Sequence, residues 1–204
     1  MSTVDPTLFE RTRSAALLSL LENDGFVFIP DSIPLSLLRE LKDECLDARN
    51  SALRAEGQGE LQYRSSLAPL GMKGRELLEN AASSEILEPL FGRKFSCSWN
   101  ASCYTYYEAG DFLAAHLDGV ENCEVTLLFY LDATTPGNDP GESGLHLTLY
   151  RQDEGGVVVP RKTIATTAGG IMLGFGSRVL HGRRRLAEGE HIFMLTACFT
   201  SAPA

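Results

Sequence analysis

The residues best suited to chemistry lie in the middle of the chain, where His116, Leu117 and Asp118 form an HxD element directly after an apolar run. Two imidazoles and one carboxylate are the ligands that hold one face of a non-haem iron and leave the other positions open. With four histidines in 204 residues, an HxD element alone is a weak signal. A metal site also requires a third ligand and a scaffold that brings it close.

The third ligand is predicted to be His181. It follows the apolar segment 169–180, where the chain leaves a predicted strand. His146 instead lies inside an alternating segment, where a hydrogen-bonded or exposed strand histidine is the simpler interpretation. We therefore expect His116, Asp118 and His181 to be the metal ligands and the catalytic centre.

The scaffold for these residues is predicted to be a β-sheet that begins near residue 95. From Phe95 to Tyr104, apolar and polar residues alternate with a period of two, which is typical of a half-buried strand. Further short strands are expected at 125–131, 145–150, 157–159, 171–175 and 191–199. Short strands separated by turn residues, without long intervening helices, indicate an antiparallel sandwich or barrel.

The first half of the chain is predicted to be mainly helical. One helix begins at Asp5-Pro6 and ends before Asn23-Asp24-Gly25, a short strand covers 26–30, and a second amphipathic helix covers 34–55. Residues 57–92 have a mixed pattern, in which 64–74 reads as loop and helical pieces are expected at 76–82 and 84–91. We expect one domain over 1–204, with 1–94 as helical support and a candidate substrate wall, and 95–200 as the β core with the metal site.

Composition excludes several classes of function. The formal net charge of −9 and a pI near 4.9 disfavour nucleic acid, because phosphate binding depends on Lys and Arg. No apolar run approaches the length of a membrane span, and the first residues carry no signal region, so a cytoplasmic location without membrane contact is expected. The five cysteines contain no CxxC pair and their number is odd, so we expect reduced, mostly buried thiols.

Four segments together resemble the Fe(II)/2-oxoglutarate-dependent oxygenases, and within them the prolyl 4-hydroxylase-like group. Tyr107-Glu108-Ala109-Gly110 precedes the HxD element at the distance at which that group has its YExG element. The sequences TLLFYLD, GESGLHL and HGRRRLAEGEHIF are similar to the group's next strand, its glycine-rich turn and its distal histidine segment. The resemblance implies a double-stranded β-helix, a cupin-like jelly roll that is mainly β with N-terminal helices. It also implies Fe(II) as the cofactor, with 2-oxoglutarate and O2 as cosubstrates.

One position departs from the family pattern. The family has a Lys or Arg about ten residues after the distal histidine, which binds the far carboxylate of 2-oxoglutarate, whereas this chain has His191. Three explanations stay open. His191 binds that carboxylate beside Tyr130; Arg183 or Arg185 replaces it; or the cosubstrate is bound differently or is another molecule. Tyr107 is expected in the pocket wall.

The resemblance implies oxidative decarboxylation of 2-oxoglutarate coupled to hydroxylation or a related C–H oxidation. The presence of Asp118 favours hydroxylation, because related halogenases lack this carboxylate. The compact, acidic chain favours a small-molecule substrate, such as an amino acid or a biosynthetic intermediate, with no particular oligomeric state implied. The alternatives are a prolyl-type hydroxylase of proteins or peptides and a cupin-like metalloprotein that does not use 2-oxoglutarate. Candidate substrate cations are Arg64, Arg75 and Arg151.

Overall fold

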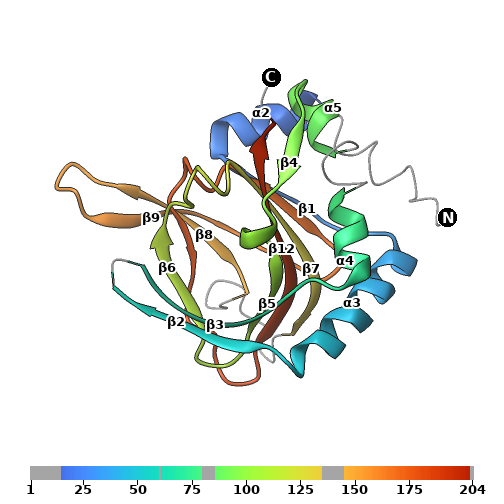
Figure 1. The fold of residues 1–204 in the computed structure, drawn as a ribbon. Helices are drawn as coiled ribbons and strands as arrows, with labels where there is room; N and C mark the ends of the chain where they lie inside the picture. Colours follow the sequence, from blue (N-terminus) through green and yellow to red (C-terminus); the bar gives the residue numbers. More distant parts are fainter. Residues whose placement is uncertain (1–14, 60, 80–85, 135–144, 203–204) are drawn as a thin grey trace.

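The computed structural model describes residues 15–59, 61–79, 86–134 and 145–202. Within these ranges the strands form one antiparallel sheet that curls into a jelly roll, in the order β1-β10-β7-β12-β5-β3-β6-β11-β8-β9 (Figure 1). Two strands lie off this path, since β2 pairs with β3 and β4 pairs with β12. The predicted double-stranded β-helix with N-terminal helices is confirmed.

The helices are α2 Ala15–Asp24, α3 Leu35–Arg49, α4 Met72–Glu76 and α5 Glu88–Phe91, and a 3-10 turn covers Trp99–Ala101. The strands are β1 Phe26–Ile29, β2 Leu53–Gln58, β3 Gln62–Ala68, β4 Phe95–Cys97, β5 Cys103–Tyr107, β6 Phe112–His116, β7 Val125–Thr134, β8 Leu147–Gln152, β9 Val158–Ile164, β10 Ile171–Gly174, β11 His181–Arg183 and β12 His191–Ser201.

Strand alternation divides the apolar side chains into two clusters, and β12 shows the division most clearly. Phe193 and Leu195 belong to the cluster that also contains the buried residues of the helices. Ile192 and Met194 belong to a second cluster, on the interior of the jelly roll. Because successive side chains point to opposite faces of a strand, a shift of one residue moves a side chain from the interior to the helix-covered face.

Helix α3 covers the outer face of the sheet next to α4 (Figure 1). Its apolar side is buried through Leu41 and Cys45, and the Tyr106 hydroxyl of β5 donates to the Cys45 carbonyl oxygen at 2.7 Å. The helix therefore stabilises the outside of the sheet and leaves the interior for other side chains.

The prediction of a loop over 64–74 was wrong for its first residues, because β3 extends to Ala68. β3 forms a hairpin with β2 and lies between β5 and β6. The alternation of Tyr63, Ser65 and Leu67 is present, but intervening polar residues reduce its contrast. The helix predicted over 34–55 ends at Arg49. The hairpin begins soon afterwards, at Leu53. The expected helix start at Asp5-Pro6 lies outside the described residues.

The predicted strand 95–104 is interrupted by the 3-10 turn, which leaves Trp99 40% exposed. Within the described residues, every helix is too short or too polar to cross a membrane.

The expectation that all five cysteines are reduced was wrong for one pair. Cys123 and Cys198 form a disulfide, with their Cα atoms 4.7 Å apart and a sequence separation of 75. Cys45, Cys97 and Cys103 are free. The pairing follows from the ladder between β7 and β12, in which Cys198 lies opposite Thr126, so spacing in the sequence did not reveal it.

Candidate metal centre

The two ligand histidines are brought together by a strand ladder. His116 is the last residue of β6 and His181 is the first residue of β11, and the two are register partners in the antiparallel pair. Their ring centroids lie 4.4 Å apart. Asp118 follows β6 by two residues, and its backbone N–H donates to the Gly176 carbonyl oxygen at 2.9 Å.

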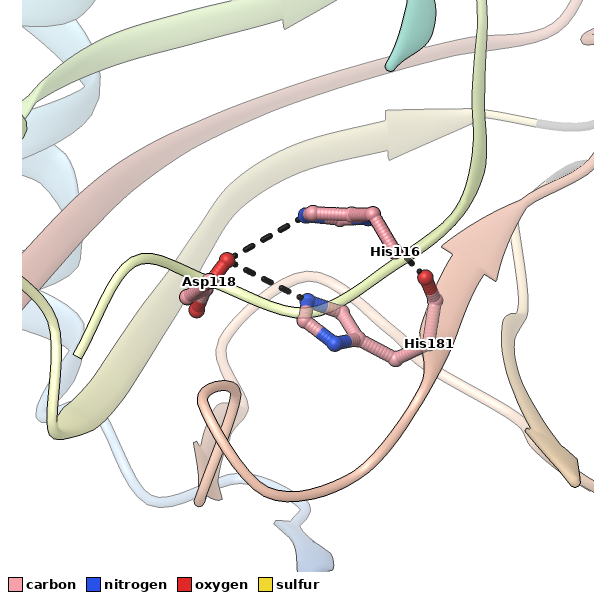
Figure 2. A group of neighbouring side chains, drawn as sticks. All are labelled: His116, Asp118 and His181. Atoms are coloured by element: carbon pink, nitrogen blue, oxygen red, sulfur yellow. Dashed lines mark hydrogen bonds and ion pairs between the residues drawn. The ribbon is translucent and has the colours of Figure 1, made fainter. Parts of the chain in front are cut away.

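The three side chains converge on one point (Figure 2). Asp118 Oδ1 lies 3.2 Å from His116 Nε2 and 3.7 Å from His181 Nε2. One ligand atom from each residue lies within 4.8 Å of the other two. Two imidazole nitrogens and one carboxylate oxygen at this separation fit a divalent ion of the non-haem iron type.

Backbone carbonyls fix both rings. His116 Nδ1 lies 3.0 Å from the His181 carbonyl oxygen, and His181 Nδ1 lies 3.0 Å from the Val179 carbonyl oxygen. A carbonyl oxygen only accepts, so each Nδ1 carries the hydrogen and each Nε2 presents its lone pair to the centre. Such bonds on the far nitrogen orient a metal-binding histidine and set its tautomer.

The protonation states also suit a metal. Burial lowers the pKa of His181 to about 4, so its imidazole is neutral near pH 7. Burial raises the pKa of Asp118, but its contacts with His116, His181 and Thr126 outweigh burial, and the net pKa is lowered. A neutral imidazole and an ionised carboxylate are the forms that bind metals.

The second oxygen of Asp118 is held by residues outside the triad. The Thr126 hydroxyl donates to Asp118 Oδ2 at 2.8 Å, which leaves Oδ1 toward the histidines. Gly176 packs so closely that a Cβ atom there would lie 1.8 Å from Oδ2. The carboxylate therefore has one orientation, and glycine is required beside it.

The triad opens on a cavity of about 440 Å³ inside the jelly roll. The lining residues come from β3, β5, β6, β7, β8, β11 and β12 and from the turn after Asp118. They include Leu61, Tyr63, Ser65, Leu67, Cys103, Thr105, Tyr107, Leu113, Glu121, Asn122, Leu128, Leu147, Arg183, Met194 and Thr196, together with the Cys123–Cys198 disulfide. Leu61, Tyr63, Ser65 and Leu67 in this wall come from the first half of the chain.

No family model and no curated protein sequence matches the chain. Solved structures do. A prolyl-4-hydroxylase from Pseudomonas putida superposes with a TM-score of 0.61 at 19% identity, over 93% of this chain and 99% of that one. The α-ketoglutarate-dependent epimerase SnoN of nogalamycin biosynthesis gives a TM-score of 0.68 at 17% identity, over 97% and 85% of the two chains.

HygX from Streptomyces hygroscopicus, with nickel and 2-oxoglutarate bound, gives a TM-score of 0.63 at 12% identity, over 92% of this chain and 86% of that one. The fold is that of the Fe(II)/2-oxoglutarate oxygenases. At these identities the likeness establishes the fold, and the site has to be argued from its own residues.

Within this oxygenase fold, Arg183 lies in the cavity wall. It follows His181 by two residues on β11, so strand alternation places the two side chains on the same face. Arg183 is 2% exposed and donates to the Leu145 carbonyl oxygen at 2.7 Å and to the Tyr130 hydroxyl at 3.0 Å. Among the described residues that line the cavity, it is the one Lys or Arg.

Two tyrosines accompany this arginine. The Arg183 guanidinium lies 5.5 Å from the ring centroid of Tyr107 and 5.8 Å from that of Tyr130. Burial raises the pKa of Tyr107 to about 12, although the charge of Arg183 opposes the shift. The Tyr107 hydroxyl is therefore protonated near pH 7 and lines the cavity as a donor.

His191 lies on the other face of the sheet. It is the first residue of β12, and its odd position in that strand puts it with Phe193, whose ring centroid is 4.7 Å away. Its Nε2 is 3.4 Å from Asp132 Oδ2, and Lys42 of α3 approaches Asp132 Oδ1 at 3.1 Å. The structure thus separates His191 from Tyr130 and the triad, because the neighbour that points inward is Ile192.

The other arginines also lie outside the cavity lining. Arg185 donates to the Gly110 carbonyl oxygen at 2.5 Å and lies over Phe112. Arg64 pairs with Glu56 at 3.0 Å, and Arg75 lies over the ring of Trp99. Arg151 is exposed near the end of β8. The structure does not bring the three candidate substrate cations to the site.

Sequence reasoning missed Thr126, Gly176 and the disulfide. Thr126 near the start of the apolar run VTLLFYL carried a weak signal, since a hydroxyl side chain is unusual in a strand buried on both faces. Gly176 carried no signal that distinguished it from other turn glycines, because its role depends on a contact with Asp118 across the fold.

Proposed function

We propose that this protein is an Fe(II)/2-oxoglutarate-dependent dioxygenase that oxidises a small molecule. The observation that carries the proposal is the convergence of His116, Asp118 and His181, with both far nitrogens hydrogen-bonded, in a cavity that also contains the buried Arg183. The oxygenase fold of the chain supports it.

Bound Fe(II) would supply the oxidation of a substrate C–H bond by O2, coupled to the conversion of 2-oxoglutarate to succinate and CO2. The chain supplies the geometry. His116 and His181 present fixed Nε2 lone pairs, and Asp118 offers Oδ1 because Thr126 occupies Oδ2. Three ligands on one side leave the cavity side open for cosubstrate and O2.

We assign the far carboxylate of 2-oxoglutarate to Arg183 in place of His191. A buried guanidinium keeps its charge and donates two parallel hydrogen bonds to a carboxylate. Arg183 is hydrogen-bonded to Leu145 and Tyr130, and its side chain lies on the same face of the sheet as that of His181. His191 lies on the opposite face. The protonated hydroxyl of Tyr107 provides a further donor at this end of the cavity.

The first test is an anaerobic titration of the Fe(II)-loaded protein with 2-oxoglutarate, with the visible metal-to-ligand charge-transfer band as the readout. The wild type is expected to develop the band, and His116→Ala is expected to lose it together with iron. Iron bound without any band would remove 2-oxoglutarate from the proposal and favour a cupin-like metalloprotein that uses another cosubstrate.

A small substrate is supported by the size of the cavity, since about 440 Å³ has to hold the cosubstrate as well. SnoN has been crystallised with nogalamycin RO, and HygX with hygromycin B. A prolyl hydroxylase from Trichoplax adhaerens, also similar in fold, binds a peptide fragment. Succinate release measured with a panel of metabolites and with proline-containing peptides separates the two classes. Stimulation by peptides alone would replace the small-molecule assignment.

A further inference from the structure

The disulfide lies in the wall of the metal cavity. Cys198 is on β12 two residues after Thr196, and both side chains line the cavity. Cys123 ends a tight turn that starts directly after Asp118, since its N–H donates to the Gly119 carbonyl oxygen at 2.8 Å. The bond therefore ties the turn that follows a metal ligand to the central strand of the sheet.

One hydroxyl connects this disulfide to the metal ligand. Cys123 Sγ lies 3.2 Å from Thr126 Oγ1, and Thr126 donates its proton to Asp118 Oδ2 at 2.8 Å. A disulfide sulfur carries no hydrogen, so the single proton of Thr126 is committed to Asp118. A thiol at Cys123 would bring a donor of its own and could change this hydrogen bond.

We propose that the Cys123–Cys198 pair is a thiol–disulfide exchange site opening on the cavity, and that its oxidation state sets the affinity of the triad for a divalent metal. This inference rests on the proposed metal site. When the S–S bond is broken, the two sulfurs separate to van der Waals contact. Because β12 is paired on both sides, the turn carrying Cys123 is the part that moves.

The exchange partner is a low-molecular-weight thiol or disulfide. Cys123 and Cys198 are buried, and their sulfurs are reached through the cavity. Two equivalents of a small thiol break the S–S bond, give two electrons and two protons to the cysteines, and leave as their own disulfide. Oxidised glutathione reverses the reaction with the same stoichiometry.

Cys103 is a neighbour on the same wall and not part of the exchange. It lies on β5 opposite Thr196 and lines the cavity. Burial raises the pKa of its thiol, and the Thr105 hydroxyl is 3.6 Å away. A thiol that stays protonated attacks a disulfide slowly, so reduction depends on the external thiol.

The first experiment counts thiols. Unfolding without reductant in the presence of iodoacetamide is expected to label three cysteines, and reduction beforehand is expected to expose all five. Labelling of five cysteines without reduction would overturn the proposal. The variant Cys45→Ala/Cys97→Ser/Cys103→Ser retains only the pair, and it serves as the protein for the next measurement.

The second experiment titrates Mn(II), which binds thiolates weakly, into the oxidised and the reduced variant by calorimetry. Reduction is expected to weaken Mn(II) binding about 10-fold, the usual size for loss of support around a ligand, and oxidised glutathione is expected to restore it. Equal affinities in the two states would overturn this proposal alone. Absence of Mn(II) binding in both states of the folded protein would overturn the metal site itself.

A third measurement uses the wild-type protein, so it does not depend on how well a variant folds. If the disulfide favours the metal, the metal must favour the disulfide by the same factor, because binding linkage is reciprocal. Saturating Mn(II) is therefore expected to shift the exchange equilibrium of the wild type with glutathione about 10-fold toward the disulfide. An equilibrium that does not respond to Mn(II), although the metal binds, would contradict the coupling.

Discussion

The deep end of the cavity and its mouth are built in different ways. At the deep end, Arg183 and Tyr107 are 2% and 4% exposed, and Arg183 is hydrogen-bonded to a backbone carbonyl and to the Tyr130 hydroxyl. At the mouth, Glu121 is exposed and its carboxylate accepts from its neighbour Asn122 at 3.4 Å. The metal triad lines the same cavity.

The difference indicates that the two ends of the cavity bind different kinds of ligand. A buried guanidinium with fixed partners recognises one ligand with one geometry, because any displacement leaves its donors unsatisfied. Exposed side chains on a turn can change conformation at little cost. We therefore assign the cosubstrate to the deep end and the variable substrate to the mouth, and the following substitutions test this assignment.

The largest effect is expected at the triad. Asp118→Ala removes the carboxylate that both histidines face, and metal affinity measured by calorimetry is expected to fall at least about 1,000-fold, since one of three ligands is lost. His191→Ala on the other face of the sheet is the matched control and is expected to bind metal like the wild type. Loss of binding in the control instead would place the site elsewhere.

The metal-free protein is expected to lose stability in acid. The pKa of His181 is about 4 in the folded state against an ordinary value of 6.5. The unfolded chain therefore takes up the proton first, and the contribution is complete above pH 6.5 and is lost as pH falls to 4. The free energy of unfolding should decrease by about 3 kcal/mol over this window. The lowered pKa of Asp118 acts in the same direction below its ordinary value of 3.8.

Urea denaturation at several pH values measures this effect. His181→Asn is expected to flatten the dependence between pH 6.5 and 4, whereas Glu121→Gln at the mouth is expected to keep it. If the free energy of unfolding of the wild type does not change over this window, His181 takes up its proton as easily in the folded protein as in the unfolded chain.

The next prediction compares the two ends of the cavity by their effect on 2-oxoglutarate binding. Arg183→Ala is expected to weaken 2-oxoglutarate binding about 30-fold, because a charged hydrogen bond to a carboxylate contributes about 2 kcal/mol. Glu121→Gln is expected to change it less than about 2-fold. The charge-transfer titration measures both. Equal effects of the two substitutions would contradict the division into a cosubstrate end and a substrate end.

The smallest effect concerns the packing behind the triad. Gly176→Ala would place a methyl group against Asp118 Oδ2, which must rotate away, and metal affinity is expected to fall about 10-fold. Gly59→Ala is the control, since its Cβ would have no atom within 4 Å. A Gly176→Ala variant with wild-type affinity would show that the carboxylate has room to move.

Much of the β core could be predicted from the sequence because its signals are local. The buried run Val125–Leu131 and the mostly apolar run 191–199 indicated β7 and β12. The hairpin β2–β3 was missed because half of its residues face solvent and are polar, which conceals the period of two. The metal triad could be predicted from the HxD spacing and from the position of His181 after a strand.

The residues at the cosubstrate end of the cavity could not be predicted from the sequence in the same way. The family pattern directed attention to His191, but the inward face of β12 is set by its register with β5 and β7, and Ile192 occupies it. Arg183 is placed by the pairing of β11 with β6, in which it lies opposite Leu113 after a shift in register from the His181–His116 pair. A register is a contact between distant segments, and a single sequence does not contain it.

The sequence by itself indicated an antiparallel sandwich or barrel, its helical support and three candidate metal ligands, because hydrophobic periodicity and ligand type are properties of neighbouring residues, whereas the jelly roll was implied by the family resemblance. Only the tertiary structure decided which face each strand shows, which arginine enters the cavity, and that Cys123 meets Cys198 beside the metal ligand. The physical reason is that these outcomes depend on pairing across the sheet between segments far apart in the sequence, such as Ile192 of β12 and Tyr107 of β5.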